Sequence, residues 1–306
     1  MNPGTSASFR HLNASACLAA LSERDARVVV IILNWNGAPD TIQCVKQVQS
    51  LHDASFACLV VDNGSTDDSV AHIRSAHPDV PLLETGENLG FAGGCNAGIR
   101  VAMDADADAE FVWLLNNDAL PMPGALSALV EVADSDPSVG AVGSVLRYMR
   151  DPERVQTWGG GWHRPWLGAG INWRRPVPDA LVTYLVGASL LLRTQSLADV
   201  GLLDDRFFMY REDVDLCVRL RQRGWAVAVA PDSTIFHAVG GSSTGAVQRD
   251  SWVAKSAVRY YRKHAPWPLG ALAVETVGKI TARVLRGDWE RARIVWSATQ
   301  RAWRSS

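Results

Sequence analysis

The chain has 306 residues, of which 47% are hydrophobic and 20% charged, and its formal net charge is −2. This length can bury a sizeable core in one large α/β domain with appendages or in two smaller domains, and we favour one domain. No run of about 18 apolar residues occurs, which excludes a membrane-spanning helix. The apolar patch at 16–21 is too short and too interrupted for a signal peptide, so we expect a cytoplasmic protein.

The charge is distributed unevenly along the chain. Residues 255–306 carry a net charge of +8, and the preceding part carries −10. A basic C-terminal segment indicates an anionic partner, either a membrane surface or a nucleic acid. The five cysteines form no CxxC pair and lie mostly in apolar surroundings, which is typical of reduced core residues in a cytosolic protein.

The first elements in chain order predict an open α/β sheet. Residues 1–26 are rich in Ser and Ala and indicate a loose extension or one short helix. The uniformly apolar segments Val28–Leu33 and Ala57–Val61 favour buried parallel strands, and 40–51 between them favours a helix. In such sheets ligands bind at the carboxyl ends of the strands, so the polar residues found there are candidate binding residues.

Polar side chains follow both of these strands. Asn34 and Asn36 come directly after the first strand, and Asp62 follows the second. Ser65 and the acids after it are typical of a helix cap. Capping explains Asp62 less well, because an acid at this place could accept a hydrogen bond from a pyrimidine imide or a ribose hydroxyl.

A glycine-rich segment follows a third apolar segment at 81–84. It spans 87–98, and its four glycines precede or begin a helix expected from about residue 92. Glycines and free helix N–H groups allow a diphosphate to approach the backbone closely. The spacing is not GxGxxG, which disfavours a nicotinamide cofactor, and a plain turn is the alternative.

Another polar cluster follows the strand expected at Phe111–Leu115. Asn116, Asn117 and Asp118 come directly after it. A carboxylate flanked by amides at a strand end suits a hard divalent cation, which prefers oxygen ligands. The alternative is an Asx-type turn leading into Pro121.

After a helix expected at 124–134 and a strand expected at 141–148, the pattern changes. Residues 151–180 lack periodicity and are rich in Gly, Pro and Trp, including Trp158. This composition indicates an irregular segment or a small hairpin. Its aromatic rings either contact a sugar or pack inside the loop itself.

Two further strands are expected at 184–193, which contains Gly187, and at 224–230. His237 follows the second of these and precedes a Gly/Ser/Thr loop at 240–245. A lone histidine is usually structural, but this position leaves room for metal ligation or phosphate contact.

An aromatic run that ends in carboxylates lies at 204–217. Glu212, Asp213 and Asp215 begin a probable helix, where carboxylates are stabilised as anions and commonly act as caps. The aromatic run before them indicates a pocket wall, where one carboxylate could act as a general base. We expect Asp215 to pair with an arginine such as Arg219.

The C-terminal part of the chain is helical and basic. A helix is expected at 256–264, with Pro266 and Pro268 as breakers, and residues 269–304 place Arg and Trp at helical intervals. This composition is typical of an interfacial helix on anionic lipid. A basic helix packed on the domain is the equal alternative.

Together these motifs resemble the inverting glycosyltransferases of family 2, which have the GT-A fold. The resemblance covers residues 27–265 and rests on motifs that occur in the family's order, namely Leu33–Gly37, Val60–Asp67, Asn88–Gly98, Leu114–Asp118, Gly187–Ser189, Tyr210–Cys217 and His237. The Trp/Gly region and the segment ending at Pro266 are most similar to bacterial rhamnosyltransferases that use dTDP-L-rhamnose.

The resemblance implies an α/β fold with an open mixed sheet flanked by helices and a C-terminal helical tail. Residues 27–120 would form the nucleotide half of the domain and 121–265 the acceptor half, with 266–306 as the basic tail. The resemblance assigns nucleotide-sugar binding to Asn34, Asn36, Asp62, Ser65, Asn88, Gly90, Asn96, Asn117 and Asp118.

The resemblance also assigns the chemistry. Asp213 corresponds to the catalytic base, and we assign acceptor binding to Glu212, Trp158 and Gly187. Asp118 and His237 correspond to residues that hold a divalent cation, Mg²⁺ or Mn²⁺. Asn116 stands where the family's metal motif has its first Asp, which leaves one carboxylate fewer and puts strict metal dependence in doubt.

The expected function is inverting transfer of a sugar, L-rhamnose from dTDP-L-rhamnose by the closest resemblance, to a hydroxyl of a glycan or glycolipid in cell-envelope polysaccharide synthesis. One in-line displacement needs one base rather than the carboxylate pair of a retaining glycosidase. The alternative is a non-catalytic sugar-nucleotide or glycan-binding protein with the same fold. We expect no nucleic-acid partner, and a peripheral place on the inner face of the plasma membrane. The function requires Asp62, Asp118 and Asp213 to gather along one edge of the sheet.

Overall fold

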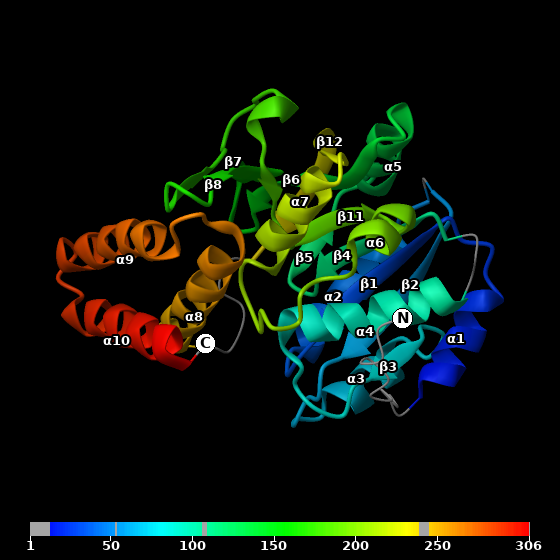
Figure 1. Cartoon of the computed structure of the whole chain (residues 1–306). Coiled ribbons are helices and arrows are strands. Elements are labelled where there is room, and N and C mark those ends of the chain that lie inside the picture. Colours follow the sequence, from blue (N-terminus) through cyan, green and yellow to red (C-terminus); the bar gives the residue numbers. More distant parts are fainter. Residues whose placement is uncertain (1–12, 53, 106–108, 239–244, 306) are drawn as a thin grey trace, which may run out of the picture.

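A mixed sheet of nine strands forms the centre of the structure, which is a computed structural model that describes residues 13–52, 54–105, 109–238 and 245–305 (Figure 1). In this part of the chain the strand order is β3-β2-β1-β4-β11-β6-β12-β5, and β7 pairs with β6. The strands are β1 (Val28–Asn34), β2 (Phe56–Asp62), β3 (Leu82–Glu84), β4 (Phe111–Asn116), β5 (Ala119–Pro121), β6 (Val139–Tyr148), β7 (Asp151–Trp158), β11 (Ser189–Arg193) and β12 (Ala226–His237).

A second sheet and ten α-helices complete the described part of the chain. The second sheet has the order β10-β8-β9, with β8 (Gly160–Arg164), β9 (Ala169–Asn172) and β10 (Tyr184–Leu185). The helices are α1 (Ala14–Ser22), α2 (Ala38–Gln49), α3 (Ser69–Ala76), α4 (Gly90–Ala105), α5 (Ala125–Ser135), α6 (Thr194–Val200), α7 (Glu212–Gln222), α8 (Ala246–His264), α9 (Pro268–Val284) and α10 (Trp289–Ser305), with a 3-10 turn at Asp179–Leu181.

The apolar strands are buried because helices cover both faces of the large sheet. Side chains alternate between the faces of a strand, so Val29 and Ile31 of β1 belong to one core cluster and Val30 and Ile32 to the other. Helices α1, α4, α6 and α7 contribute to the first cluster, and α2, α3 and α5 to the second. The α/β fold with an open mixed sheet is therefore confirmed.

The sheet brings the predicted polar residues to one edge. Strands β1, β2 and β4 are parallel, and their registers align Asn34 with Asp62 and Leu33 with Asn116. Strand β11 runs antiparallel to β4, so the segment before β11 lies beside the end of β4, where the Asn116 N–H donates to the Ala188 carbonyl at 3.0 Å. Residues from four distant parts of the sequence therefore meet there.

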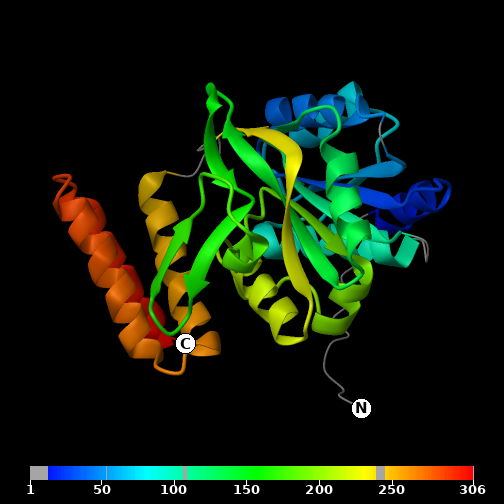
Figure 2. The ribbon, with the colours of Figure 1, turned by 90° about the horizontal axis from the view of Figure 1, so that it is seen from above.

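The C-terminal helices form a separate layer beside the sheet, with α9 and α10 lying next to α8 in both views (Figures 1 and 2). They share a third core cluster, which contains Tyr260 and Tyr261 of α8, Leu272 of α9 and Phe207. The helical layer begins at α8, so the predicted boundary at 266 falls within it, between α8 and α9.

No described helix is both long enough and apolar enough to cross a bilayer.

Some elements differ from the sequence expectation. The single strand expected at 184–193 is divided into β10 and β11, because residues 186–188 leave the sheet to reach other partners. The strand expected at 224–230 begins at Ala226 and continues through an irregularity to His237, as β12 pairs with β6 and β5. All five cysteines are buried and free, as their apolar surroundings predict. The loop expected at 240–245 lies, apart from Gly245, outside the described residues.

Candidate active site

The ends of β1 and β2 are joined by a network of short polar contacts. The carboxylate of Asp62 accepts hydrogen bonds from Asn34 Nδ2 at 2.8 Å, Ser65 Oγ at 2.6 Å and the Ser65 N–H at 3.0 Å. Asn36, whose φ is 50°, receives the Thr66 N–H on its side-chain oxygen at 2.8 Å. The four predicted residues Asn34, Asn36, Asp62 and Ser65 therefore form one unit, in which Asp62 itself is only 3% exposed.

Thr41 extends this network to the end of β4. Its hydroxyl donates to Asn34 Oδ1 at 2.7 Å and lies 3.0 Å from Asn117 Nδ2. The sequence does not single out Thr41, because a threonine in the first turn of a helix has no distinctive signal. Through this hydroxyl and Asn34, Asp62 on β2 and Asn117 beside Asp118 belong to one hydrogen-bond network.

Asp118 and His237 meet at this edge, as the sequence analysis predicted for a cation site. His237 Nε2 lies 3.2 Å from Asp118 Oδ1 and 3.3 Å from Asn116 Nδ2. His237 Nδ1 lies 3.0 Å from Gln156 Oε1, a contact that orients the imidazole ring behind Asp118. Gln156 is a second residue that the sequence does not single out.

The start of α4 uses its glycines to pack against the rest of the protein. Asn88 caps the helix, with its Oδ1 accepting the Gly90 N–H at 2.9 Å, and the Phe91 N–H donates to the Phe208 carbonyl at 2.7 Å. Gly90 has φ +74°, and a Cβ at this position would overlap the Phe208 carbonyl oxygen. The predicted close approach of backbone at Gly90 is thus present, but its partner here is protein.

Asn96 differs from its predicted role. It is 2% exposed, its Nδ2 donates to the Leu203 carbonyl at 2.7 Å, and its Oδ1 accepts the Leu203 N–H at 3.1 Å. Both groups of the amide are thus used to hold the segment before α7. The sequence motif does not reveal that this residue is on the buried face of α4, so we no longer assign Asn96 to the nucleotide.

Asp213 lies at the first turn of α7 and faces the segment before β11. Its Oδ2 accepts the Gly187 N–H at 3.0 Å, and its Oδ1 accepts the Val214 N–H at 2.7 Å. Burial raises the pKa of Asp213, while these N–H donors act in the opposite direction. Because Ala188 bonds to Asn116, the carboxylate of Asp213 lies close to the end of β4 that carries Asp118.

Glu212 and Asp215 are close in sequence, but their carboxylates differ in the partners that they contact. Glu212 is 6% exposed and its Oε2 has no hydrogen-bond partner within the described residues. Burial, and then the charge of Asp213, raises the pKa of Glu212 well above its usual value. Asp215 is fully buried and pairs with Arg219, as predicted, and also with Lys263 and His264.

Trp158 and the turn before α7 border the same region. The Val186 N–H donates to the Gly159 carbonyl at 3.0 Å, which holds the end of β7 and hence Trp158 beside Gly187. Arg211, which precedes Glu212, has φ 72°. Its guanidinium, mostly covered by the protein, pairs with Glu275 of α9 and lies over the rings of Tyr260 and Tyr261. The C-terminal helical layer therefore supports the turn that carries Asp213.

The structure thus brings Asp62, Asp118 and Asp213 to one edge of the sheet. Two sites, the network around Asp62 and the Asp118–His237 pair, are on the side of β1, β2 and β4. Asp213 is held at this edge by its bond to the Gly187 N–H, next to the Ala188–Asn116 contact. The described residues contain no group of three or more His, Cys, Asp or Glu side chains that could hold a metal ion.

Comparison with known sequences gives a consistent result. The profile of glycosyl transferase family 2 matches residues 29–180, which include the network around Asp62 and end before Asp213. The N-acetylglucosaminyl-diphospho-decaprenol L-rhamnosyltransferase of Mycobacterium tuberculosis is 29% identical over 229 residues, which are 68% of this chain and 75% of that protein. The pre-mycofactocin glycosyltransferase of the same organism is 28% identical over 281 residues, 90% of this chain and 53% of that protein.

A solved structure has a similar fold. The mannosyltransferase PcManGT of Pyrobaculum calidifontis, determined with GDP-Man and Mn²⁺, superposes with a TM-score of 0.57 at 22% identity and covers 96% of this chain and 87% of its own. At this identity, the similarity shows that the two chains share a fold.

Proposed function

Since the chain belongs to glycosyltransferase family 2 and has the GT-A fold, we propose that it transfers L-rhamnose from dTDP-L-rhamnose, with inversion, to a hydroxyl of a lipid-linked glycan. The observation that carries this proposal is the position of Asp213, which the Gly187 N–H orients at the edge occupied by Asp118. The similarity to an L-rhamnosyltransferase, whose name gives a diphospho-decaprenol acceptor, supports L-rhamnose as the transferred sugar and the acceptor class. A role in cell-envelope polysaccharide synthesis is part of the same proposal.

The proposed reaction requires one base. Asp213 removes the proton from the acceptor hydroxyl as its oxygen attacks the anomeric carbon, and the nucleotide diphosphate leaves from the opposite face. Burial raises the pKa of Asp213 and makes it a stronger base than an exposed Asp, while the Gly187 N–H fixes which oxygen faces the acceptor. Trp158, Gly187 and Glu212 border the place that the acceptor would occupy.

The residues at the edge of the sheet suit the nucleotide diphosphate and a divalent cation. Asn36 and Ser65 are half-buried and would contact the base and ribose, while the buried Asn34 and Asp62 hold them in place. Asn88 and Asn117, which are also half-buried, would continue this site, and the buried Gly90 would shape it. Asp118 and His237 would hold Mg²⁺ or Mn²⁺, since a carboxylate oxygen and an imidazole nitrogen lie 3.2 Å apart. Such a cation neutralises charge on the departing diphosphate.

The C-terminal helices suit a peripheral place on the cytoplasmic face of an anionic membrane. Residues 266–306 expose a set of large apolar side chains, namely Trp267, Leu269, Val274, Val277, Leu285, Trp289 and Trp296. The tail also exposes cations such as Arg286 and Arg293. Apolar side chains beside cations favour binding to anionic lipid surfaces.

The donor is tested with purified protein and a set of nucleotide sugars, with and without Mg²⁺ or Mn²⁺. We expect dTDP-L-rhamnose to raise the melting temperature most, because a ligand that binds only the folded state stabilises it. Product analysis with a short-chain lipid diphosphate sugar as acceptor should then detect an inverted rhamnoside. Stabilisation by another nucleotide sugar alone would reject the donor, and donor binding without transfer to any acceptor would reject the activity.

The membrane site is tested by sedimentation with phosphatidylglycerol vesicles. The double variant Leu285→Ser/Trp289→Ser should lower the bound fraction at least about tenfold, since two large apolar groups no longer enter the bilayer. Met122→Ser, which changes an exposed apolar residue next to β5, is the matched control. Equal retention of all three proteins would show that the tail is not the membrane site.

A further inference from the structure

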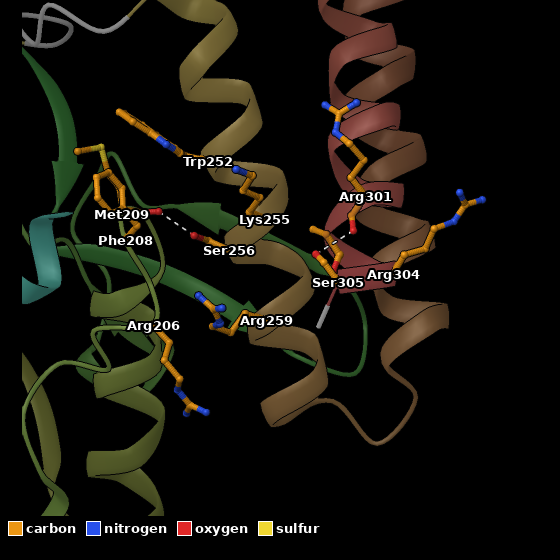
Figure 3. Close-up of a pocket in the computed structure, with 11 residues that line it drawn as sticks. Arg206, Phe208, Met209, Trp252, Lys255, Ser256, Arg259, Arg301, Arg304 and Ser305 are labelled. Atoms are coloured by element: carbon orange, nitrogen blue, oxygen red, sulfur yellow. Dashed lines mark hydrogen bonds between the residues drawn. The ribbon is translucent and has the colours of Figure 1, made fainter. Parts of the chain in front are cut away.

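A basic cavity lies between the segment before α7 and the C-terminal helices (Figure 3). Its volume is about 630 Å³, and it is open to solvent. No acidic side chain lines it. The lining residues are Arg206, Phe208, Met209, Trp252, Lys255, Ser256, Arg259, Arg301, Ala302, Arg304 and Ser305. Five cations therefore surround one hollow, although the whole chain is slightly acidic.

Most of these cations are available to a ligand. Arg206 pairs with Asp204, but no carboxylate among the described residues lies within ion-pairing distance of Lys255, Arg259, Arg301 or Arg304. Like charges gathered around one hollow without acidic partners attract an anion, and guanidinium groups suit phosphate oxygens in particular.

One wall of the cavity is apolar. Phe208 and Trp252 have ring centroids 5.3 Å apart, and Met209 lies beside them. In Figure 3 Trp252, Ser256 and Arg259 project from α8 toward the segment 206–209. A ligand that carries both a multiply charged anionic group and an apolar chain would match the two kinds of lining.

The walls are fixed to one another in the protein. Ser256 Oγ donates to the Met209 carbonyl at 2.7 Å, which holds the segment before α7 against α8. Arg262 of α8 donates to the Trp303 carbonyl at 2.6 Å and lies over the Trp303 ring, which holds the last turns of α10. A ligand therefore meets a cavity that is already formed, which reduces the entropy cost of binding.

The cavity is connected to the base by direct contacts. The Phe208 carbonyl accepts the Phe91 N–H at 2.7 Å. A Cβ placed on Gly187 would lie 3.5 Å from both Phe91 Cε1 and Asp213 Cβ, so the Phe91 ring borders the site of the base. The network around Asp62 and the Asp118–His237 pair belong to other elements, the ends of β1, β2, β4 and β12.

We propose that this basic cavity binds the diphosphate group of a prenyl-diphosphate-linked acceptor, with the first prenyl units against Phe208, Met209 and Trp252. This assignment rests on the proposed function, because it supplies the anchor that presents the acceptor sugar to Asp213. The cations contribute affinity for the diphosphate, and the apolar wall distinguishes a lipid diphosphate from free pyrophosphate.

The binding test uses calorimetry with geranyl diphosphate and inorganic pyrophosphate, in the presence of saturating dTDP to fill the donor side. Wild-type protein should bind geranyl diphosphate at least about tenfold more tightly than pyrophosphate, because only the former contacts the apolar wall. The variant Lys255→Ala/Arg259→Ala should lose about tenfold or more in affinity, since each lost cation removes a charge-assisted contact. Arg286→Ala/Arg293→Ala removes the same charge elsewhere on the helical layer and should bind as wild type does.

Each result decides the assignment. Equal affinity of wild type and the Lys255/Arg259 variant would overturn it, as would equal loss in the control variant. Equal binding of pyrophosphate and geranyl diphosphate would assign the cavity to a free diphosphate and reject the lipid. Melting temperatures identify a variant that fails to fold, in which case Lys255→Ala alone is measured.

A kinetic test separates this assignment from the proposed function. With a soluble short-prenyl diphosphate sugar as acceptor, the Lys255/Arg259 variant should raise the acceptor KM about tenfold and leave kcat and the donor KM unchanged. Absence of transfer by the wild type would reject the proposed function, whereas the calorimetric result for geranyl diphosphate would stand by itself. A changed donor KM would instead assign the cavity to the donor.

Discussion

The backbone N–H of Gly187 donates to Oδ2 of Asp213 at 3.0 Å, although the two residues are 26 positions apart and belong to different elements. This bond fixes the carboxylate of the proposed base beside the end of β4. It also explains why the strand expected at 184–193 is interrupted, because residues within a continuous strand would use their N–H groups in the sheet.

Asp213→Asn should lower kcat by about 100-fold to 10,000-fold, the usual effect of losing a general base. Binding of the nucleotide should persist, because the network around Asp62 does not include Asp213. Steady-state kinetics and calorimetry with dTDP measure the two properties. Asp205→Asn, an exposed acid in the same loop, is the control; a variant Asp213→Asn with normal turnover would remove Asp213 from the mechanism.

Glu212→Gln should stabilise the protein more at pH 8 than at pH 5. The folded state raises the pKa of Glu212 above its usual value of 4.5, so the folded state retains this proton while the unfolded state releases it. The contribution of Glu212 to stability is therefore present at low pH and lost as pH rises through its folded pKa. Urea unfolding at the two pH values measures the difference, and a pH-independent difference would contradict it.

Gly90→Ala should destabilise the protein more than Gly124→Ala does. Both glycines have φ near +80°, which disfavours alanine by about 1 kcal/mol. A Cβ on Gly90 would also overlap the Phe208 carbonyl, whereas Gly124 has nothing within 4 Å of a Cβ. The additional loss at Gly90, measured by urea unfolding, should exceed about 1 kcal/mol. Equal losses of stability in the two variants would mean that the segment at Phe208 moves away from the new Cβ without a loss of stability.

Asn116→Asp should strengthen binding of Mn²⁺ by about tenfold or more, because it adds a carboxylate beside Asp118 and His237. His237→Gln should weaken it, since the imidazole lone pair is lost. Calorimetric titration of Mn²⁺ into the protein with dTDP reads affinity without relying on turnover. Identical affinity in both variants and the wild type would place the cation elsewhere.

The sequence predicted which polar residues lie at the strand ends better than it predicted the long-range hydrogen bonds that hold them. Asn34, Asp62 and Asn116 each follow an apolar run, and parallel strands place their ends together, so their meeting follows from local patterns. The bond of His237 to Gln156 joins residues 81 positions apart and has no local signal. Asn96 was misassigned for a related reason, because a motif does not show which helix face is buried.

The C-terminal tail was also only partly predictable. Its basic and apolar pattern left lipid binding and packing on the domain as equal alternatives, because an amphipathic pattern does not name its partner. The structure shows packing through Glu275 and the third core cluster, and it leaves apolar side chains such as Trp289 and Trp296 exposed. The helices can therefore serve both purposes with different faces.

The ion pair between Arg211 and Glu275 affects how the protein can be shortened. A truncation at residue 265, made to improve solubility, would remove the only carboxylate that pairs with Arg211 among the described residues. A guanidinium with 14% of its side chain exposed would then lack a counterion, one residue before Glu212 and two before Asp213. Loss of activity in the truncated chain would therefore be explained by displacement of this turn, and the intact chain is the suitable material for crystallisation and assay.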